Sequence, residues 1–179
     1  MSTVATLLAG ALALATPALR PQAVSFPTAD GGTIHADLYG EGEAAVVLVH
    51  GARFDKQSWR PQARRIARAG FRVLAIDLRG YGESTGGTET RDPYAGYPLD
   101  VLGAVRYLRR NGATTVSVIG ASLGGWAAAR ASVESERGEI DRLVLLAHSP
   151  IDEAERMMGR KLFVVTENDP GPAGTKRLP

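Results

Sequence analysis

The residues with the clearest chemical potential are a serine and its flanking glycines in the stretch Gly120-Ala121-Ser122-Leu123-Gly124. A β-branched stretch, Thr115–Ile119, precedes them, and a stretch rich in small residues, Leu123–Ser132, follows. A strand that turns sharply into a helix holds such a serine in a strained conformation with its hydroxyl exposed. Glycines suit the flanking positions because side chains there would collide across the turn. The helix that follows directs N–H groups and a positive dipole end at developing negative charge. The pattern therefore predicts that Ser122 is a nucleophile.

A serine nucleophile needs a base, and the choice in this chain is small. Cysteine is absent, which excludes thiolate chemistry, and any imidazole chemistry must come from His35, His50 and His148. His35 lies in a predicted hairpin and is expected at the surface. His50 closes an apolar strand. His148 follows the strand Leu143–Leu146, at the carboxyl end where open α/β sheets bind ligands. His148 is therefore the candidate base by position.

The elements that must position these residues alternate between strands and helices. This alternation predicts an α/β fold around a mostly parallel sheet. Continuous apolar runs such as Ala45–Val49 are typical of strands covered on both faces. The expected strands are Ala23–Pro27 and Thr33–Tyr39 as a hairpin, then Ala45–Val49, Phe71–Ile76, Thr115–Ile119, Leu143–Leu146 and Leu162–Val165. The expected helices are Gln57–Ala69, Leu99–Arg110, Leu123–Ser132 and a short Asp152–Met158.

Composition excludes several classes of protein. A length of 179 residues with 44% hydrophobic and 22% charged residues fits one globular domain. Lys+Arg 21 against Asp+Glu 19 gives a net charge of +2, which is too balanced to indicate a nucleic-acid partner. No cluster of side chains has metal-ligand spacing, and no phosphate-binding glycine loop is present, so neither a metal nor a cofactor is expected.

The N-terminus resembles an export signal. Val4–Leu19 is an apolar run that is too short for a stable membrane span and fits the hydrophobic part of a signal peptide. No Lys or Arg precedes it, so an uncleaved anchor or a misassigned start remains an alternative. We expect residues 1–21 to be a leader, residues 22–179 to form one domain, and the protein to be secreted or periplasmic, or otherwise cytoplasmic.

Four segments together resemble the α/β-hydrolase fold family of serine esterases and lipases. His50-Gly51 is similar to the family's oxyanion loop, and Gly120–Gly125 is similar to its nucleophile elbow. Asp77–Ser84 (DLRGYGES) matches a D-x-R-G-x-G-x-S segment, and Lys161–Asp169 is similar to the strand and loop that carry the family's acid. The resemblance implies a three-layer fold and a serine hydrolase that needs no cofactor.

The resemblance also implies roles for individual residues. Ser122 would attack the substrate, and the backbone N–H groups of Ala52 and Leu123 would form the oxyanion hole, supported by the motif residues His50, Gly51, Gly120 and Gly124. Asp169 would orient a histidine, with Asp152 as the alternative acid. The family's catalytic histidine follows its acid, and no histidine follows Asp169 here.

The missing histidine leaves three interpretations open. The chain could lack the C-terminal strand and histidine of the fold. His148 or His50 could have become the base. The chain could also be a catalytically silent binding unit, or one completed by a partner. Leu162–Val165 is expected to be an exposed edge strand, which favours a homo-oligomer or a completing chain.

The expected substrate is a small carboxylic ester. Only 13 residues separate Ala147 from Lys161, which leaves no room for a cap domain, so the site should be open. Thioester, amide or perester chemistry is compatible with the same residues.

Overall fold

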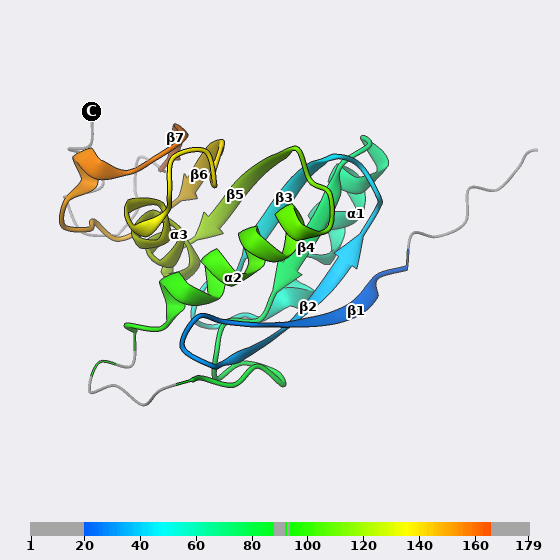
Figure 1. Cartoon of the computed structure of the whole chain (residues 1–179), viewed down its shortest axis with the longest axis horizontal. Helices are drawn as coiled ribbons and strands as arrows, with labels where there is room; N and C mark the ends of the chain where they lie inside the picture. The colour runs from blue at the N-terminus through cyan, green and yellow to red at the C-terminus, as the bar shows by residue number, and fades with distance from the viewer. Residues whose placement is uncertain (1–19, 88–91, 93, 166–179) are drawn as a thin grey trace, which may run out of the picture.

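A seven-stranded sheet forms the centre of the molecule. A computed structural model describes residues 20–87, 92 and 94–165 (Figure 1). The strand order is β1-β2-β4-β3-β5-β6-β7. β1 pairs antiparallel with β2, and β2 pairs antiparallel with β4, whereas the other pairs are parallel. The mostly parallel sheet is therefore confirmed. The strands are β1 (Gln22–Pro27), β2 (Thr33–Tyr39), β3 (Ala44–Val49), β4 (Arg72–Ile76), β5 (Thr115–Ala121), β6 (Arg142–Leu146) and β7 (Arg160–Val164).

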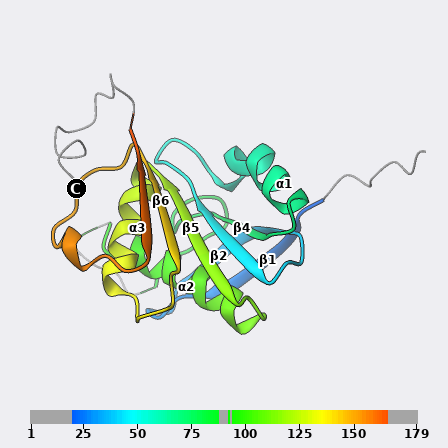
Figure 2. The same cartoon turned by 90° about the horizontal axis from the view of Figure 1, so that it is seen from above.

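Helices cover both faces of this sheet and make the fold three layers deep. α1 (Arg60–Arg68) packs Ala63 and Ala67 on one face. α2 (Tyr97–Arg110) and α3 (Leu123–Glu134) pack on the other face, as Figure 2 shows. The central strands β3 and β4 are buried on both sides because of these helices, which explains the apolar sequence of β3 and of β4 after Arg72.

The helix predicted over Gln57–Ala69 is divided in two. Asp55 caps a 3₁₀ turn, η1 (Lys56–Trp59), by accepting a hydrogen bond from the N–H of Gln57 at 2.9 Å. α1 then starts at Arg60, with Pro61 in its first turn. Proline has no N–H to donate to the turn before it, so the α-helix has to begin there.

The last strand, β7, lies at the edge of the described sheet. Its outward residues are exposed, with Leu162 at 56% and Val164 at 45%. The helix predicted over Asp152–Met158 is wrong, because only the 3₁₀ turn η2 (Ala154–Arg156) forms. Glu153, just before η2, has a left-handed backbone (φ 60°), which interrupts a helical path. No cap domain lies between β6 and β7, as expected.

Two predictions concern residues outside the described ranges. The leader assignment rests almost entirely on residues 1–19, and Asp169 falls in 166–179. Both stay predictions. In the part of the chain that is described, no helix has the length and apolarity to cross a bilayer.

Candidate functional site

Ser122 occupies a strained turn between β5 and α3. Its backbone has φ 52° and ψ −117°, values that residues with a side chain rarely adopt. Two hydrogen bonds hold the turn: the N–H of Ser122 donates to the carbonyl of Leu146 (2.9 Å), and the N–H of Trp126 donates to the carbonyl of Ser122 (3.0 Å). Ser122 is exposed, and Leu123 begins the helix. The N–H groups of a helix's first turn have no intrahelical partner, so the amide of Leu123 is available to an anion beside Ser122.

The flanking glycines are required by close backbone contacts. A Cβ on Gly120 would lie 2.6 Å from the carbonyl carbon of Gly124. A Cβ on Gly124 would lie 2.7 Å from the carbonyl carbon of Val49. Real Cβ atoms do not approach backbone so closely, so any larger residue would force β5, α3 and the end of β3 apart.

The loop after β3 lies directly against Ser122. A Cβ built on Gly51 would be 3.4 Å from the Cβ of Ser122. His50 is 1% exposed, and its Nε2 accepts the N–H of Leu78 at 3.1 Å. Its Nδ1 must therefore carry the proton, which it donates to the carbonyl of Gly51 at 2.9 Å. Burial lowers the pKa of His50 and favours this neutral form.

These bonds determine the direction of the Ala52 amide. The carbonyl of Gly51 accepts both the His50 ring and the N–H of Phe54 (3.0 Å). In a planar trans peptide the C=O and the following N–H point in opposite directions, so the Ala52 N–H points away from the His50 ring. His50 is thus engaged on both ring nitrogens by backbone, which suits positioning and leaves it no nitrogen for proton transfer.

Sequence reasoning assigned no role to two other groups that hold this loop. The hydroxyl of Tyr81 donates to the carbonyl of Ala52 at 2.9 Å, and its ring meets the His50 ring edge-on with centroids 4.6 Å apart. Lys56 forms an ion pair with Asp77, which is 1% exposed and also accepts the backbone N–H of Lys56 at 2.7 Å. The only sequence signal was that Tyr81 and Asp77 lie in the DLRGYGES segment.

Arg79 of the same segment ties together two further parts of the fold. Its guanidinium contacts Asp100 of α2 at 2.7 Å and Asp30 of the β1–β2 turn at 2.6 Å. Asp100 is fully buried, and burial raises its pKa to about 6 despite the arginine. The hydrogen bond from Arg79 lowers the pKa of Asp30 to about 2. The arginine therefore anchors the loop that in turn holds Ala52.

His148 lies near the elbow but inside the protein. It is 1% exposed, and its ring stacks on Phe163 of β7 with centroids 5.7 Å apart. A Cβ on Gly125, in the first turn of α3, would come within 2.6 Å of the His148 Cβ. Burial lowers the pKa of His148, so the imidazole is neutral at pH 7. The structure thus brings His148 beside the helix that starts at Leu123.

The remaining candidates are separate from this cluster. Asp152 is exposed and lines a cavity of about 410 Å³ with Trp126, Arg130 and Ile151, whose lining does not include Ser122. His35 is one-third exposed and lies 3.5 Å from Glu83, as expected for a hairpin residue. Within the described residues, no group of three or more potential metal ligands gathers.

Sequence comparison identifies the family. The model of the alpha/beta hydrolase family matches residues 46–178, and the chain belongs to that family. It is 38% identical over 127 residues to bifunctional epoxide hydrolase 2 of Sus scrofa, and 31% identical over 115 residues to the pimeloyl-[acyl-carrier protein] methyl ester esterase of Cronobacter sakazakii. These alignments include 65% and 64% of this chain, but only 22% and 40% of the two relatives. The chain thus spans less than half the length of either relative.

Solved structures agree on the fold. An esterase from Pyrococcus furiosus matches with a TM-score of 0.64 at 24% identity, over 73% of this chain and 53% of that one. Epoxide hydrolase A from Mycobacterium thermoresistibile matches with a TM-score of 0.61 at 27% identity, over 73% of this chain and 40% of that one. The relatives are hydrolases, and they include both esterases and epoxide hydrolases.

Proposed function

We propose that this chain carries the nucleophile and oxyanion hole of a serine hydrolase that acts on carboxylic esters. The observation that carries the proposal is the conformation of Ser122, an exposed serine at φ 52° directly before a helix. Strain of this kind costs about 1–3 kcal/mol and persists at functional sites. It presents the hydroxyl to a substrate beside the first amides of α3.

The reaction proceeds in two steps. The Oγ of Ser122 attacks the ester carbonyl carbon and loses its proton to a base, while the N–H groups of Leu123 and Ala52 stabilise the oxyanion. The C–O bond to the alcohol then breaks, and the alcohol leaves with that proton. Water then loses a proton to the same base and attacks the acyl carbon, the bond from that carbon to the Oγ of Ser122 breaks, the base returns the proton to Oγ, and the acid is released. Each oxyanion donor supplies about 3 kcal/mol in the transition state.

The chemistry of serine favours esters over epoxides, although relatives of both kinds exist. Attack of a serine oxygen on an epoxide carbon would form an ether, which water does not cleave at neutral pH. Attack on an ester carbonyl forms an acyl-serine, which water does cleave. An enzyme that must turn over therefore uses Ser122 on acyl compounds.

His148 is the candidate base among the described residues. It follows β6, lies beside the first turn of α3, and is kept neutral by burial, which a base requires. A His148→Gln variant should then lose turnover. Loss of one such residue costs about 10⁴-fold to 10⁶-fold in rate, so a variant that retains wild-type turnover places the base elsewhere.

The test of the nucleophile is covalent labelling. A fluorophosphonate probe should modify Ser122 alone, located by peptide mass spectrometry, and Ser122→Ala should abolish both labelling and hydrolysis of short-chain p-nitrophenyl esters. Ser25→Ala, at an exposed position on β1, is the matched control and should keep both. Unchanged hydrolysis in Ser122→Ala would refute the assignment.

A second function is favoured by the edge of the sheet. The exposed apolar residues Leu162 and Val164 on β7 suit a unit that another chain completes, with little ester turnover of its own. A stable complex combined with no turnover in the isolated chain would support this alternative. A monodisperse monomer with ordinary esterase rates would exclude it.

A further inference from the structure

The positive charge of the chain is concentrated in one segment. Residues 53–72 contain seven basic side chains and one acidic side chain, Asp55, and so carry +6. Because the whole chain carries +2, the other residues together carry −4. The basic residues are Arg53, Lys56, Arg60, Arg64, Arg65, Arg68 and Arg72. The net charge of the whole chain is small, but residues 53–72 are strongly basic.

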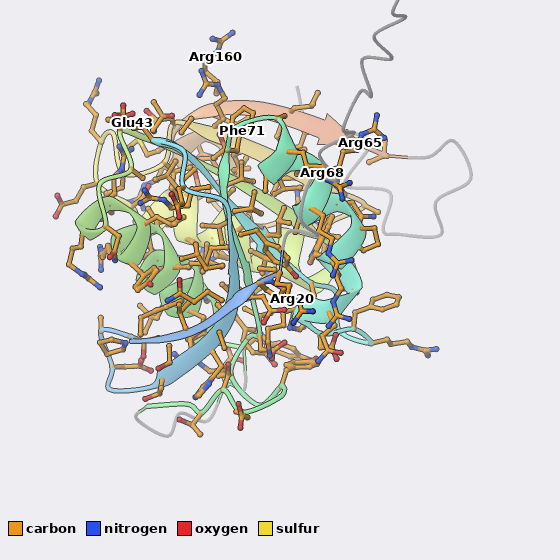
Figure 3. The ribbon with its side chains drawn as sticks, turned by 90° about the vertical axis from the view of Figure 1, so that its right-hand side faces the viewer. Arg20, Glu43, Arg65, Arg68, Phe71 and Arg160 are labelled. Atoms are coloured by element: carbon orange, nitrogen blue, oxygen red, sulfur yellow. The ribbon has the colours of Figure 1, made fainter. Side chains whose placement is uncertain are left out.

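Helix α1 carries four of these seven basic side chains and exposes three of them to solvent. Ala63 and Ala67 face the sheet, whereas Arg60, Arg65 and Arg68 are exposed. Figure 3 shows Arg65 and Arg68 projecting from α1 on the side of the molecule turned toward the viewer. Among the described residues, no carboxylate lies within ion-pair distance of these three arginines.

The stability of the helix does not account for so many arginines. The helix dipole favours Arg65 and Arg68 in the last turn. Arg60 and Arg64 lie four residues apart in the first half and repel each other, and Arg64 and Arg68 repeat the same spacing. No acidic residue on α1 offsets this repulsion. The charge is thus better explained by an anionic partner.

Exposed aromatic rings stand at both ends of the basic segment. Phe54, before η1, is 61% exposed, and Phe71, after α1, is 36% exposed. The nine residues of α1 extend about 14 Å, and the two phenylalanines lie before and after this helix in the chain. Clustered basic side chains attract an anionic lipid surface, and exposed phenylalanine rings favour the interfacial region of a bilayer. A nucleic acid duplex would satisfy the arginines but would leave both rings in water.

One end of this surface borders the candidate site. The Cδ2 atom of Phe54 is 3.6 Å from the Cβ position of Gly51, which in turn lies 3.4 Å from the Cβ of Ser122. A lipid surface in contact with Phe54 would therefore lie beside the exposed Ser122.

We propose that the surface made of Arg60, Arg65 and Arg68 on α1, with Phe54 and Phe71 before and after the helix, docks on the surface of an anionic phospholipid membrane. The guanidinium groups contact the lipid phosphates, and the two rings enter the interface. This binding does not depend on ester hydrolysis.

The test is co-sedimentation of the full chain with vesicles. The protein should bind phosphatidylcholine vesicles that contain phosphatidylglycerol, and not vesicles of phosphatidylcholine alone. Each arginine contributes about fivefold to the partition coefficient, so the variant Arg60→Gln/Arg65→Gln/Arg68→Gln should bind about 100-fold more weakly. High salt should have the same effect, because it screens surface charge.

Two further variants make the outcome specific. The control Arg110→Gln/Arg137→Gln/Arg142→Gln removes the same charge from three exposed arginines outside α1 and should bind like the wild type. Phe54→Ser/Phe71→Ser should weaken binding while leaving every charge in place. Circular dichroism establishes that each variant is folded.

Several results would overturn the proposal. One is equal loss of binding in the two arginine variants, which would mean that only net charge matters. Another is unchanged binding in the α1 variant or in the phenylalanine variant. A third is binding to a DNA fragment or to heparin without binding to phosphatidylglycerol vesicles.

Discussion

Replacing Ser122 with glycine should stabilise the fold relative to replacing it with alanine. At φ 52° and ψ −117°, a residue with a Cβ is strained by about 1–3 kcal/mol, whereas glycine is not. Glycine also gives the unfolded chain more freedom, which offsets about 0.4–1 kcal/mol of that gain. The free energy of unfolding of Ser122→Gly should therefore exceed that of Ser122→Ala by about 1 kcal/mol.

Alanine is the correct reference because it removes only the hydroxyl. The side chain of Ser122 makes no capping hydrogen bond to α3, so Ser122→Ala should be about as stable as the wild type. Denaturant unfolding followed by tryptophan fluorescence measures the difference in the free energy of unfolding. In thermal unfolding of a chain of this size, 1 kcal/mol corresponds to a shift of about 2–4 °C in Tm.

The control pair for this measurement is at Ser25, an exposed position on strand β1. In extended backbone, glycine is less favourable than alanine by about 0.5–1 kcal/mol, so Ser25→Gly should be the less stable variant. The order of stability should thus reverse between the two sites. If Ser122→Gly is no more stable than Ser122→Ala, the elbow is not strained, and the structural argument for a nucleophile fails.

Three other substitutions test the supports of the site. Burial lowers the pKa of His50 below its ordinary 6.5. As the pH falls, the His50 imidazole is therefore protonated in the unfolded chain at a higher pH than in the folded chain. Stability should decline as the pH falls below 6.5, and His50→Gln should show a smaller decline in urea unfolding at pH 7 and pH 5.5. Gly124→Ala should lower the free energy of unfolding by about 2–3 kcal/mol, because its Cβ meets rigid backbone on β3. Arg79→Met leaves buried Asp100 without its cation and should cost about 3–5 kcal/mol, and a denaturation midpoint equal to that of the wild type would contradict the pairing.

Most elements could be predicted because local signals were strong. Short runs rich in apolar and β-branched residues predicted β3, β4 and β5, and the serine between glycines predicted the turn from β5 into α3. The missing helix after Asp152 shows the limit of such signals. The residues there favour a helix, but the connection between β6 and β7 places Glu153 in a left-handed conformation, which a helix does not allow.

The supports of the site could not be predicted in the same way. The bond from Tyr81 to Ala52 joins residues 29 positions apart, and the bond from Leu78 to His50 joins residues 28 apart. No periodicity encodes contacts of this kind, because they depend on how β3 and β4 end side by side. The motif positions pointed to the right segments, but only three-dimensional structure assigns individual donors and acceptors.

These contacts make the DLRGYGES segment the main support of the candidate oxyanion loop. Asp77 binds Lys56, the backbone of Leu78 binds His50, and Tyr81 binds Ala52, so each bond reaches a different point of residues 50–56. Arg79 anchors the segment itself to α2 and to the β1–β2 turn through two carboxylates. An oxyanion donor is effective only when it is held in place before the reaction. These buried polar contacts fix the position of the loop that carries the Ala52 N–H. A substitution in the DLRGYGES segment should therefore impair turnover more than its loss of stability alone accounts for.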